Sequence, residues 1–590
     1  MTDYNAPLDD IKFCLRHAAG LDEILQLNVY DGVEIDDIDP ILDEAGRFAR
    51  DVVAPTNRIG DEQGVSVENG TVKVPAEFAD VNQQLVENGW PALGGSPEHD
   101  GMGLPETVEF ATSEMWQSAN MAFTLLTMLT RDATHLIKAH ASDELKQTYL
   151  PKITTGEWAA TMDLTEPQAG SDLAAVKAKA TPDGDAYRIF GNKVFITWGD
   201  QELTENIIHL VLARVDGAPE GVRGISLFLV PKFVLDADGN PGERNDLVCA
   251  SVEHKLGIHG SPTCVLNFGE GDGAVGYLVG EENKGLAAMF TMMNHARVEV
   301  GLQGVSVSER ALQLARSYAN DRVQGRVPGQ SGRAPIVHHA DVRRMLLLMR
   351  SQTEAMRALA YATASQLDKL HHDERKEAQK AAESRLSLLT PVVKGWNTET
   401  AQEVTSLGVQ IHGGMGYVEE TGAAQHMRDA RILPIYEGTT GIQALDFAGR
   451  KIVGDEGHEI KSLIGELKDA CDAMEKDDAL QSIGRDVRQG LEQLEQGVDW
   501  LLSNAADNRA AVGTASVNLL MLAGVVLGGA FLARATLASR LDGGVDASFA
   551  DAKLATTRFY CGHVLPRAHG YLAAARADPD ITMGLDVESI

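Results

Sequence analysis

The spacing of apolar residues changes character three times along the chain. Up to about residue 158, apolar side chains recur every three or four positions, which predicts helices, and a glycine-rich loop at 94–103 interrupts them. From about 160 to 285, short runs of β-branched and aromatic residues between Gly, Asp and Pro turns predict strands. The clearest of these runs are 194–197, 207–211, 225–230 and 264–268.

Helical periodicity returns after residue 285. Two apolar stripes, typical of the core of a helix bundle, are Ala311, Leu314, Ala315 and Tyr318, and Val342, Met345, Met349 and Met356. A Gly-Asp-Glu-Gly segment at 454–457 separates this region from further helices. We therefore predict an α+β protein of four domains. They are an N-terminal helical domain with an N-terminal extension (1–159), a middle β domain (160–285), a helical bundle (286–453) and an extra C-terminal helical domain (454–590).

One uncharged apolar run raises the question of a membrane span. It extends from Leu519 to Ala533 and contains Gly524, Gly528 and Gly529. A bilayer requires about 20 apolar residues, so this run is short. We predict a buried helix at a helix–helix or subunit contact, and no membrane insertion. The N-terminus has neither the basic segment nor the apolar core of a signal peptide, and we expect a cytoplasmic protein.

Charge and cysteine content exclude several classes. The net charge of −33 disfavours nucleic-acid binding, which needs a basic surface. The five cysteines are scattered without a C-x-x-C pair, so neither a disulfide framework nor a metal site is expected. At 590 residues the chain is too long for a single hydrophobic core.

The segment around Glu437 is the strongest candidate for catalysis. Glu437 follows the apolar run Ile435-Tyr436 at a point where a helix could restart. Burial would raise the pKa of this carboxyl toward neutrality and make it a competent general base. A glutamate at a helix start is more often a cap or a partner of the helix dipole, so this alternative remains open on the residues alone.

Other residues suit a flavin. The Thr165 and Thr197 hydroxyls could hydrogen-bond ring atoms, and Gly413-Gly414 would let the backbone approach a pyrophosphate. Each also has an ordinary role in a turn or strand as its alternative. The chain has no strand–G-x-G-x-x-G–helix unit, which argues against a Rossmann dinucleotide site.

Four segments, in order, resemble signatures of the acyl-CoA dehydrogenase family. They are Leu164–Asp172 (flavin and substrate loop), Lys193–Thr197 (strand against the isoalloxazine), Gln410–Tyr417 (turn at a neighbouring subunit's FAD) and Ile435–Thr439 (catalytic segment). The resemblance covers roughly residues 85 to 450, and the two terminal extensions resemble the large bacterial branch. It implies an N-terminal helical domain, a β-barrel-like middle domain and a four-helix bundle, followed here by the extra helical domain.

The resemblance also implies the chemistry. Glu437 would remove the α-proton of an acyl-CoA while hydride passes from the β-carbon to N5 of FAD. The implied FAD contacts are Met162, Leu164, Thr165, Phe195, Thr197, Arg322, Gln324, Gln410, Gly413, Gly414 and Thr439. The implied substrate contacts are Ser171, Asn294, Arg297 and Gly438. Some relatives carry the base just before the central-helix arginine, where this chain has Ala296, and we expect Glu299 to be an ordinary helix residue.

Likeness to the large bacterial branch implies a short-chain substrate. The first expectation is oxidation of 3-methylmercaptopropionyl-CoA to methylthioacryloyl-CoA in dimethylsulfoniopropionate degradation. The alternative is a broad-specificity dehydrogenase for short- and medium-chain acyl-CoAs in β-oxidation. An acyl-CoA oxidase and a DNA-associated flavoprotein share the fold. The DNA-associated flavoprotein is disfavoured, because DNA binding needs a basic region and residues 455–590 hold 12 Lys or Arg against 21 Asp or Glu. The expected partners are electron-transfer flavoprotein and a second copy of the chain, in a dimer.

Overall fold

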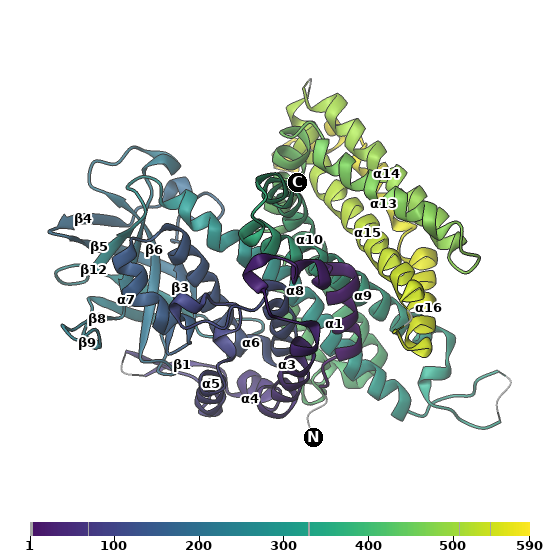
Figure 1. Ribbon diagram of the computed structural model, residues 1–590, viewed down its shortest axis with the longest axis horizontal. Coiled ribbons are helices and arrows are strands. Elements are labelled where there is room, and N and C mark those ends of the chain that lie inside the picture. The colour runs from purple at the N-terminus through teal and green to yellow at the C-terminus, as the bar shows by residue number, and fades with distance from the viewer. Residues whose placement is uncertain (1–3, 69, 329–330, 507, 543, 590) are drawn as a thin grey trace.

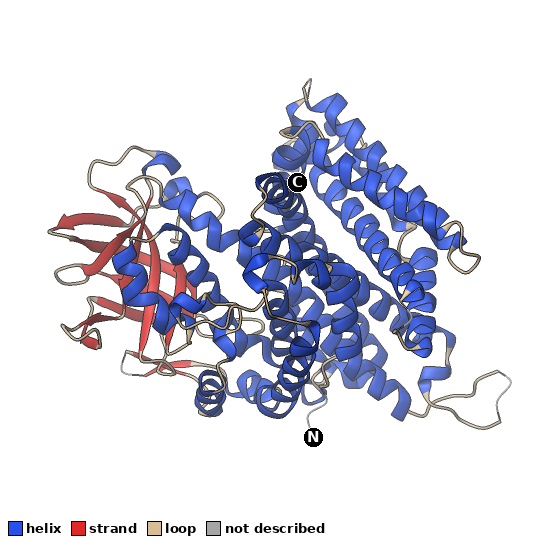
Figure 2. Cartoon of the chain, in the orientation of Figure 1, coloured by secondary structure: helices blue, strands red, loops and turns tan. Residues whose placement is uncertain are grey.

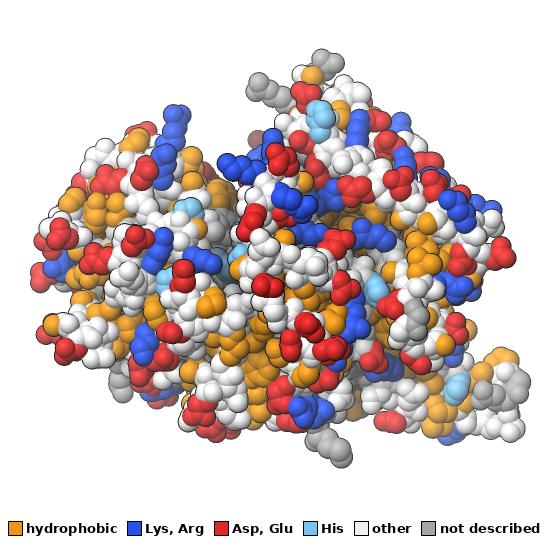
Figure 3. All heavy atoms as spheres, in the orientation of Figure 1, with side chains coloured by type: hydrophobic (Ala, Val, Ile, Leu, Met, Phe, Trp, Pro, Cys, Tyr) orange, Lys and Arg blue, Asp and Glu red, His pale blue; other side chains and the backbone are white. Residues whose placement is uncertain are grey.

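The computed structural model describes residues 4–68, 70–328, 331–506, 508–542 and 544–589. Strands gather at one end of the molecule, long helices fill its centre, and the C-terminal helices lie along the opposite side (Figures 1 and 2). Acidic side chains are spread over the face shown in Figure 3, with Lys and Arg interspersed. The predicted order of helical, β, helical and extra helical regions is confirmed.

The N-terminal region is helical, with one small hairpin. Its elements are α1 (Leu8–Cys14), α2 (Leu21–Ile24), α3 (Ile35–Phe48), α4 (Pro55–Gln63), β1 (Ser66–Glu68), β2 (Thr71–Lys73), α5 (Glu77–Glu87), α6 (Glu106–His140) and α7 (Asp143–Thr154). Helix α6 is kinked at Asn120, whose backbone is not helical. The Asn120 side chain accepts a hydrogen bond from the Phe123 backbone N–H, which caps the second half of the helix.

The middle region is a curled eight-stranded sheet. Its strands are β3 (Trp158–Asp163), β4 (Lys179–Asp183), β5 (Ala186–Thr197), β6 (Asn206–Val215), β7 (Ser226–Pro231), β10 (Leu247–Val252), β11 (Thr263–Phe268) and β12 (Ala274–Val279). The order is β10-β11-β5-β12-β7-β6-β3, and β4 pairs with both β5 and β6. A separate hairpin consists of β8 (Phe233–Leu235) and β9 (Pro241–Arg244). The four predicted strand segments overlap β5, β6, β7 and β11.

Three long helices form the bundle, and two shorter ones complete it. They are α8 (Gly285–Asp321), α9 (Ala340–His372), α10 (Lys376–His412), α11 (Ala423–Ala430) and α12 (Thr440–Leu445). The extra domain contains α13 (His458–Met474), α14 (Gln481–Ala505), α15 (Arg509–Leu541), α16 (Ala547–His563), α17 (Arg567–Ala575) and α18 (Pro579–Met583). Helix α15 packs on α9, α10, α12 and α14, so the extra domain is fixed to the bundle.

Helix α15 contains the uncharged apolar run. Among the described residues, Ala510–Leu541 is the one helix long and apolar enough to cross a membrane, but 83% of its most apolar window is buried in the protein. A Cβ added at Gly524 would lie 2.0 Å from Cγ of Trp396, and one at Gly528 would lie 2.5 Å from Cη2 of the same indole. The glycines therefore let α15 approach α10 closely, and the prediction of a buried helix is confirmed.

A buried ion network joins the N-terminal extension to the rest of the chain. The Arg357 guanidinium on α9 pairs with Asp10 on α1, Glu114 on α6 and Glu309 on α8. Lys553 on α16 pairs with the same Asp10. Removing one member of such a network leaves a buried charge without its partner, which typically costs about 3–5 kcal/mol.

The contact between α15 and Trp396 predicts opposite effects for two glycines of one helix. Gly524→Ala should destabilise the protein by about 1–3 kcal/mol, because its methyl group would overlap the buried indole. Gly513→Ala should stabilise it by about 0.5–1 kcal/mol, because Gly513 is exposed and a Cβ there meets no atom within 4 Å. Urea unfolding of both variants measures the difference. Equal changes in the free energy of unfolding for the two variants would contradict the close packing of Gly524 on Trp396.

Candidate active site

The candidate base lies on a left-handed turn between α11 and α12. Glu437 has φ 55° and Gly438 has φ 90°. A non-glycine residue in this region costs about 1–3 kcal/mol and persists only where its surroundings enforce it. Arg297 Nε and Gln443 Nε2 donate to the Glu437 carbonyl at 3.3 Å and 3.1 Å. Lys394 Nζ donates to the Gly438 carbonyl at 2.6 Å. Side chains from α8, α12 and α10 thus hold the turn.

The residues on either side of the turn are also anchored. The Tyr436 hydroxyl donates to the Gln303 side chain on α8. Thr439 caps α12, because its Oγ1 accepts from the Ile442 backbone N–H at 3.3 Å. Thr439 therefore fills the helix-capping role that the sequence left open for Glu437.

The electrostatic surroundings tune the Glu437 carboxyl. Burial raises its pKa to about 7, the charges of Arg297 and Lys394 oppose the rise, and the nearby charge of Asp132 adds to it. The residue as a whole keeps partial solvent exposure. Burial likewise lowers the pKa of Lys394 to about 7, against the opposing effect of the Glu437 charge. The result is a carboxylate that titrates near neutrality beside two basic side chains.

A backbone donor accompanies the carboxylate. The Glu437 carbonyl accepts two side-chain hydrogen bonds, whereas its N–H has no acceptor within the described part of the chain. Such a donor on a rigid turn can stabilise a developing oxyanion without reorganising during the reaction.

A second group of predicted residues lies where β3 and β5 end. Met162 is on β3, Leu164 and Thr165 follow that strand, and Phe195 and Thr197 are on β5. The loop after β3 and the end of β5 are joined directly, because the backbone N–H of residue 194 donates to the Thr165 carbonyl at 2.9 Å.

The buried Lys193 ammonium reinforces this join. It donates to the Leu164 carbonyl at 3.0 Å and to Glu166 at 2.8 Å. The loop and the strand edge therefore form one surface. The sequence did not single out the Lys193–Glu166 pair, because an ion pair between residues 27 positions apart leaves no local pattern.

The end of β5 is strained and exposes an aromatic ring. Phe195 has φ 60°, Trp198 has φ 54°, and the pairing with β11 shifts register between Cys264 and Leu266. Phe195 is 62% exposed, although phenylalanine is usually buried. An exposed ring near the Thr197 hydroxyl provides both a stacking face and a hydrogen-bonding group.

A third group lies at the end of the bundle. Gln410, Gly413 and Gly414 are exposed, and a Cβ added at either glycine would meet no atom within 4 Å. The backbone there is open to a close-approaching ligand. Tyr318 of α8 stacks on His412 of α10 with ring centroids 4.4 Å apart, so the ends of these two helices are adjacent.

Arg322 and Gln324 belong to the same end of the bundle. Both are exposed and directly follow α8. Among the described residues, no hydrogen bond or ion pair connects them, or the Gly413 turn, to the surface around Phe195. Within one chain the predicted FAD contacts therefore fall into separate groups.

The predicted substrate contacts are only partly brought together. Arg297 is buried behind the Glu437 turn, and its Nη1 donates to Asn294 Oδ1 at 3.4 Å. Asn294 itself is exposed on α8, and Ser171 is exposed on the loop after β3.

Glu299 is a residue of helix α8 that makes a structural ion pair. It is buried and pairs with Arg131 at 2.6 Å, since the kinked α6 brings that arginine against α8. Ala296, the alternative base position, is also buried and carries no ionisable group.

The second and third groups fit a flavin nucleotide. An exposed aromatic ring and threonine hydroxyls suit an isoalloxazine, and the open glycine backbone suits a phosphate. The Glu437 turn presents a carboxyl whose pKa is raised to about 7 and an N–H donor.

Family models match nearly the whole chain. The acyl-CoA dehydrogenase N-terminal, middle and C-terminal domains match residues 36–157, 161–270 and 283–452. A domain described as acetyl-CoA dehydrogenase C-terminal like matches residues 463–586.

Individual relatives agree with these matches. The chain is 47% identical to 3-methylmercaptopropionyl-CoA dehydrogenase of Ruegeria pomeroyi, over 95% of this chain and 96% of the relative. It is 34% identical to a butyryl-CoA dehydrogenase of Syntrophomonas wolfei, over 96% of each. The fold is similar to that of a Bacillus anthracis acyl-CoA dehydrogenase complexed with FAD, with TM-score 0.75, 22% identity, and 94% and 90% of the two chains covered. The chain therefore belongs to the acyl-CoA dehydrogenase family, the flavin-dependent oxidoreductases that use FAD to desaturate acyl-CoA thioesters.

Proposed function

We propose that Glu437 is the base of this dehydrogenase and that its substrate is a short-chain acyl-CoA. The observation that carries the assignment is the turn itself. It combines a carboxyl whose pKa is raised to about 7 with a backbone N–H that has no acceptor in the described chain. A base with a pKa near the working pH is the most effective, because it is largely ionised and still accepts a proton readily.

The chain's own groups divide the work at the thioester. The ionised Glu437 carboxylate takes the proton from the α-carbon and becomes a neutral acid. The Glu437 N–H donates to the thioester carbonyl oxygen, on which negative charge develops as the proton leaves. Arg297 and Lys394 keep the turn in place through the carbonyls of residues 437 and 438. Their positive charges favour the ionised carboxylate before the reaction.

The predicted flavin residues complete the site. FAD, when bound, supplies the acceptor for the hydride that leaves the β-carbon. Thr165, Phe195 and Thr197 would hold its ring system at the edge of β5. Gln410 and the Gly413-Gly414 backbone of a second copy would hold its phosphates, which is why we propose a dimer.

The proposed substrate is 3-methylmercaptopropionyl-CoA, an intermediate of dimethylsulfoniopropionate degradation. The support is the 47% identity to the Ruegeria pomeroyi enzyme over 95% of the chain. A second candidate, supported by the likeness to butyryl-CoA dehydrogenase over 96% of the chain, is oxidation of straight short-chain acyl-CoAs. We further propose electron-transfer flavoprotein as the electron acceptor and the cytoplasm as the location.

Replacing the base by its amide tests the central assignment. Glu437→Gln should lower kcat by about 10³-fold or more, because the amide cannot accept the α-proton. Flavin content and acyl-CoA binding should persist. Glu383→Gln, an exposed change on α10, is the matched control and should leave turnover unchanged. A loss below tenfold in Glu437→Gln would reject the base assignment.

The pH profile tests the environment of Glu437. Because the carboxylate must be ionised, kcat/KM should rise with pH to about 7 and level off above it. Lys394→Met removes a charge that lowers the Glu437 pKa, so the rising limb should move to higher pH. Lys461→Met, on the exposed face of α13, should leave the profile in place. If the rising limb of kcat/KM in Lys394→Met stayed at the same pH or moved to lower pH, the proposed effect of the Lys394 charge on the Glu437 pKa would be contradicted.

Substrate range distinguishes the two candidate functions. A thioether sulfur and a methylene are similar in size and polarity, so a pocket separates them by only on the order of 1 kcal/mol. We expect butyryl-CoA to be oxidised with kcat/KM within about tenfold of that for 3-methylmercaptopropionyl-CoA. Parallel assays with both thioesters decide this point. Turnover of the thioether alone would contradict the weak discrimination expected of the pocket.

A further inference from the structure

A cavity separate from the Glu437 turn lies between the two halves of α6. Its volume is about 450 Å³, and it is bounded by α5, α7, β3 and the glycine-rich loop at 94–103. Among its lining residues are Glu106, His135 and His371, whereas Glu437 is not one of them. None of the residues assigned above to FAD or to the substrate lines this cavity.

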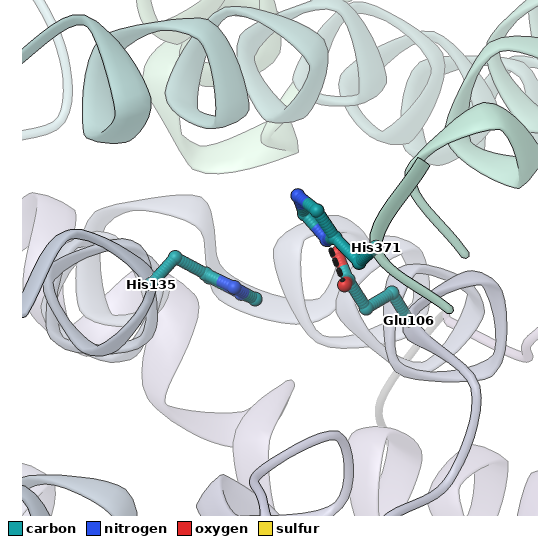
Figure 4. Close-up of side chains that lie close together, drawn as sticks. All are labelled: Glu106, His135 and His371. Carbon is teal, nitrogen blue, oxygen red and sulfur yellow. Dashed lines mark hydrogen bonds and ion pairs between the residues drawn. The ribbon is translucent and has the colours of Figure 1, made fainter. Parts of the chain in front are cut away.

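Three side chains converge at its wall from distant parts of the sequence. Glu106 begins α6, His135 lies in the second half of the same helix, and His371 lies at the end of α9. One ligand atom from each lies within 4.8 Å of the others. Figure 4 shows the His135 ring pointing toward Glu106 and His371. These two residues form an ion pair in which His371 Nδ1 lies 2.6 Å from Glu106 Oε1.

Two buried atoms of the cluster have no hydrogen-bond partner among the described residues. They are Glu106 Oε2 and His135 Nε2. Glu106 is only 6% exposed. More than nine in ten buried polar groups in proteins are hydrogen-bonded, and an exception often marks the place of an ion or a water molecule. Two exceptions within one small cluster therefore point to a ligand.

The surroundings have the character of an outer shell. His295 stacks on His135 with ring centroids 4.4 Å apart, and its Nδ1 lies 2.7 Å from Asp132 Oδ1. His295 Nε2 lies 3.6 Å from Glu106 Oε2. His295 thus packs on His135 and lies beside Glu106, as a residue of the outer shell of a metal site does.

The carboxyl groups near the cavity differ in their partners. The carboxyl groups are those of Glu106, Glu109, Asp132 and Glu299, and the permanently charged bases are Arg131 and Lys138. Arg131 pairs with two of these carboxyl groups. Its Nη2 lies 2.6 Å from Glu299 Oε1, and its Nε lies 3.9 Å from Glu109 Oε2. Glu106 and Asp132 thus face histidines rather than an arginine or a lysine.

We propose that Glu106, His135 and His371 bind a divalent transition-metal ion, with Zn²⁺ the best match. Two imidazoles and one carboxylate form a ligand set typical of zinc, whereas Mg²⁺ and Ca²⁺ prefer oxygen ligands alone. Three protein ligands leave a fourth position, which faces the cavity and would take water. The ion would tie both halves of α6 to the end of α9.

The sequence by itself predicts no metal site, because the proposed ligands are far apart along the chain. His135 follows Glu106 by 29 positions, and His371 follows His135 by 236, so no short motif contains them. The kink at Asn120 brings the two α6 ligands together by folding the helix back on itself.

Calorimetric titration of chelator-treated holoenzyme with ZnCl₂ tests the site. We expect one equivalent to bind and the thermal midpoint to rise, since a ligand that binds only the folded state stabilises it. His371→Gln should weaken this binding at least tenfold, as loss of a ligand costs no less than loss of an outer-shell group. The His371 side chain is 37% exposed, so this variant should fold normally.

Two further variants make the result specific. Glu106→Gln should weaken Zn²⁺ binding to a similar extent, and flavin content reports whether this buried change preserves the fold. His254→Gln removes an exposed histidine elsewhere and should leave Zn²⁺ binding unchanged. No binding by the wild type, or equal binding by the wild type and His371→Gln, would overturn the proposal.

Discussion

The left-handed turn at Glu437 and Gly438 is the constraint on which the site depends. In the proposed reaction the carboxylate must be enclosed enough for its pKa to reach about 7, yet ionised when the substrate arrives. Burial and the charges of Arg297 and Lys394 act in opposite directions on that pKa. The same two side chains also hold the backbone, because they donate to the carbonyls of Glu437 and Gly438. Charge balance and geometry are therefore set together.

The extra C-terminal domain supports this turn through α10. Gly395 follows Lys394, and a Cβ at Gly395 would lie 2.5 Å from Leu520 of α15 and 3.6 Å from Gln443. Trp396, the next residue, fills the space left by the glycines of α15. The helix that supplies Lys394 is thus packed between the added domain and the catalytic segment. This packing connects the extension to the proposed active site.

Local patterns were sufficient to predict much of this molecule, and contacts between distant segments decided the rest. Strand runs such as 207–211 and the buried apolar helix at 519–533 follow from residues close together in the sequence. The role of Glu437 as the base follows only from the family resemblance and stays a prediction. Lys394 could not be predicted, because its role depends on a contact with Gly438, 44 positions away. Phe195 has the character of an ordinary strand residue, and its positive φ and exposed ring arise from the bulged pairing of β5 with β11.

Anaerobic mixing of the holoenzyme with 3-methylmercaptopropionyl-CoA is the most direct test of the account. The visible flavin absorption should bleach rapidly in the wild type, and the Glu437→Gln protein should bind the thioester without bleaching. Equal bleaching in both proteins would show that another group removes the α-proton. A yellow wild-type protein that neither this thioester nor butyryl-CoA bleaches would contradict the proposed substrate class.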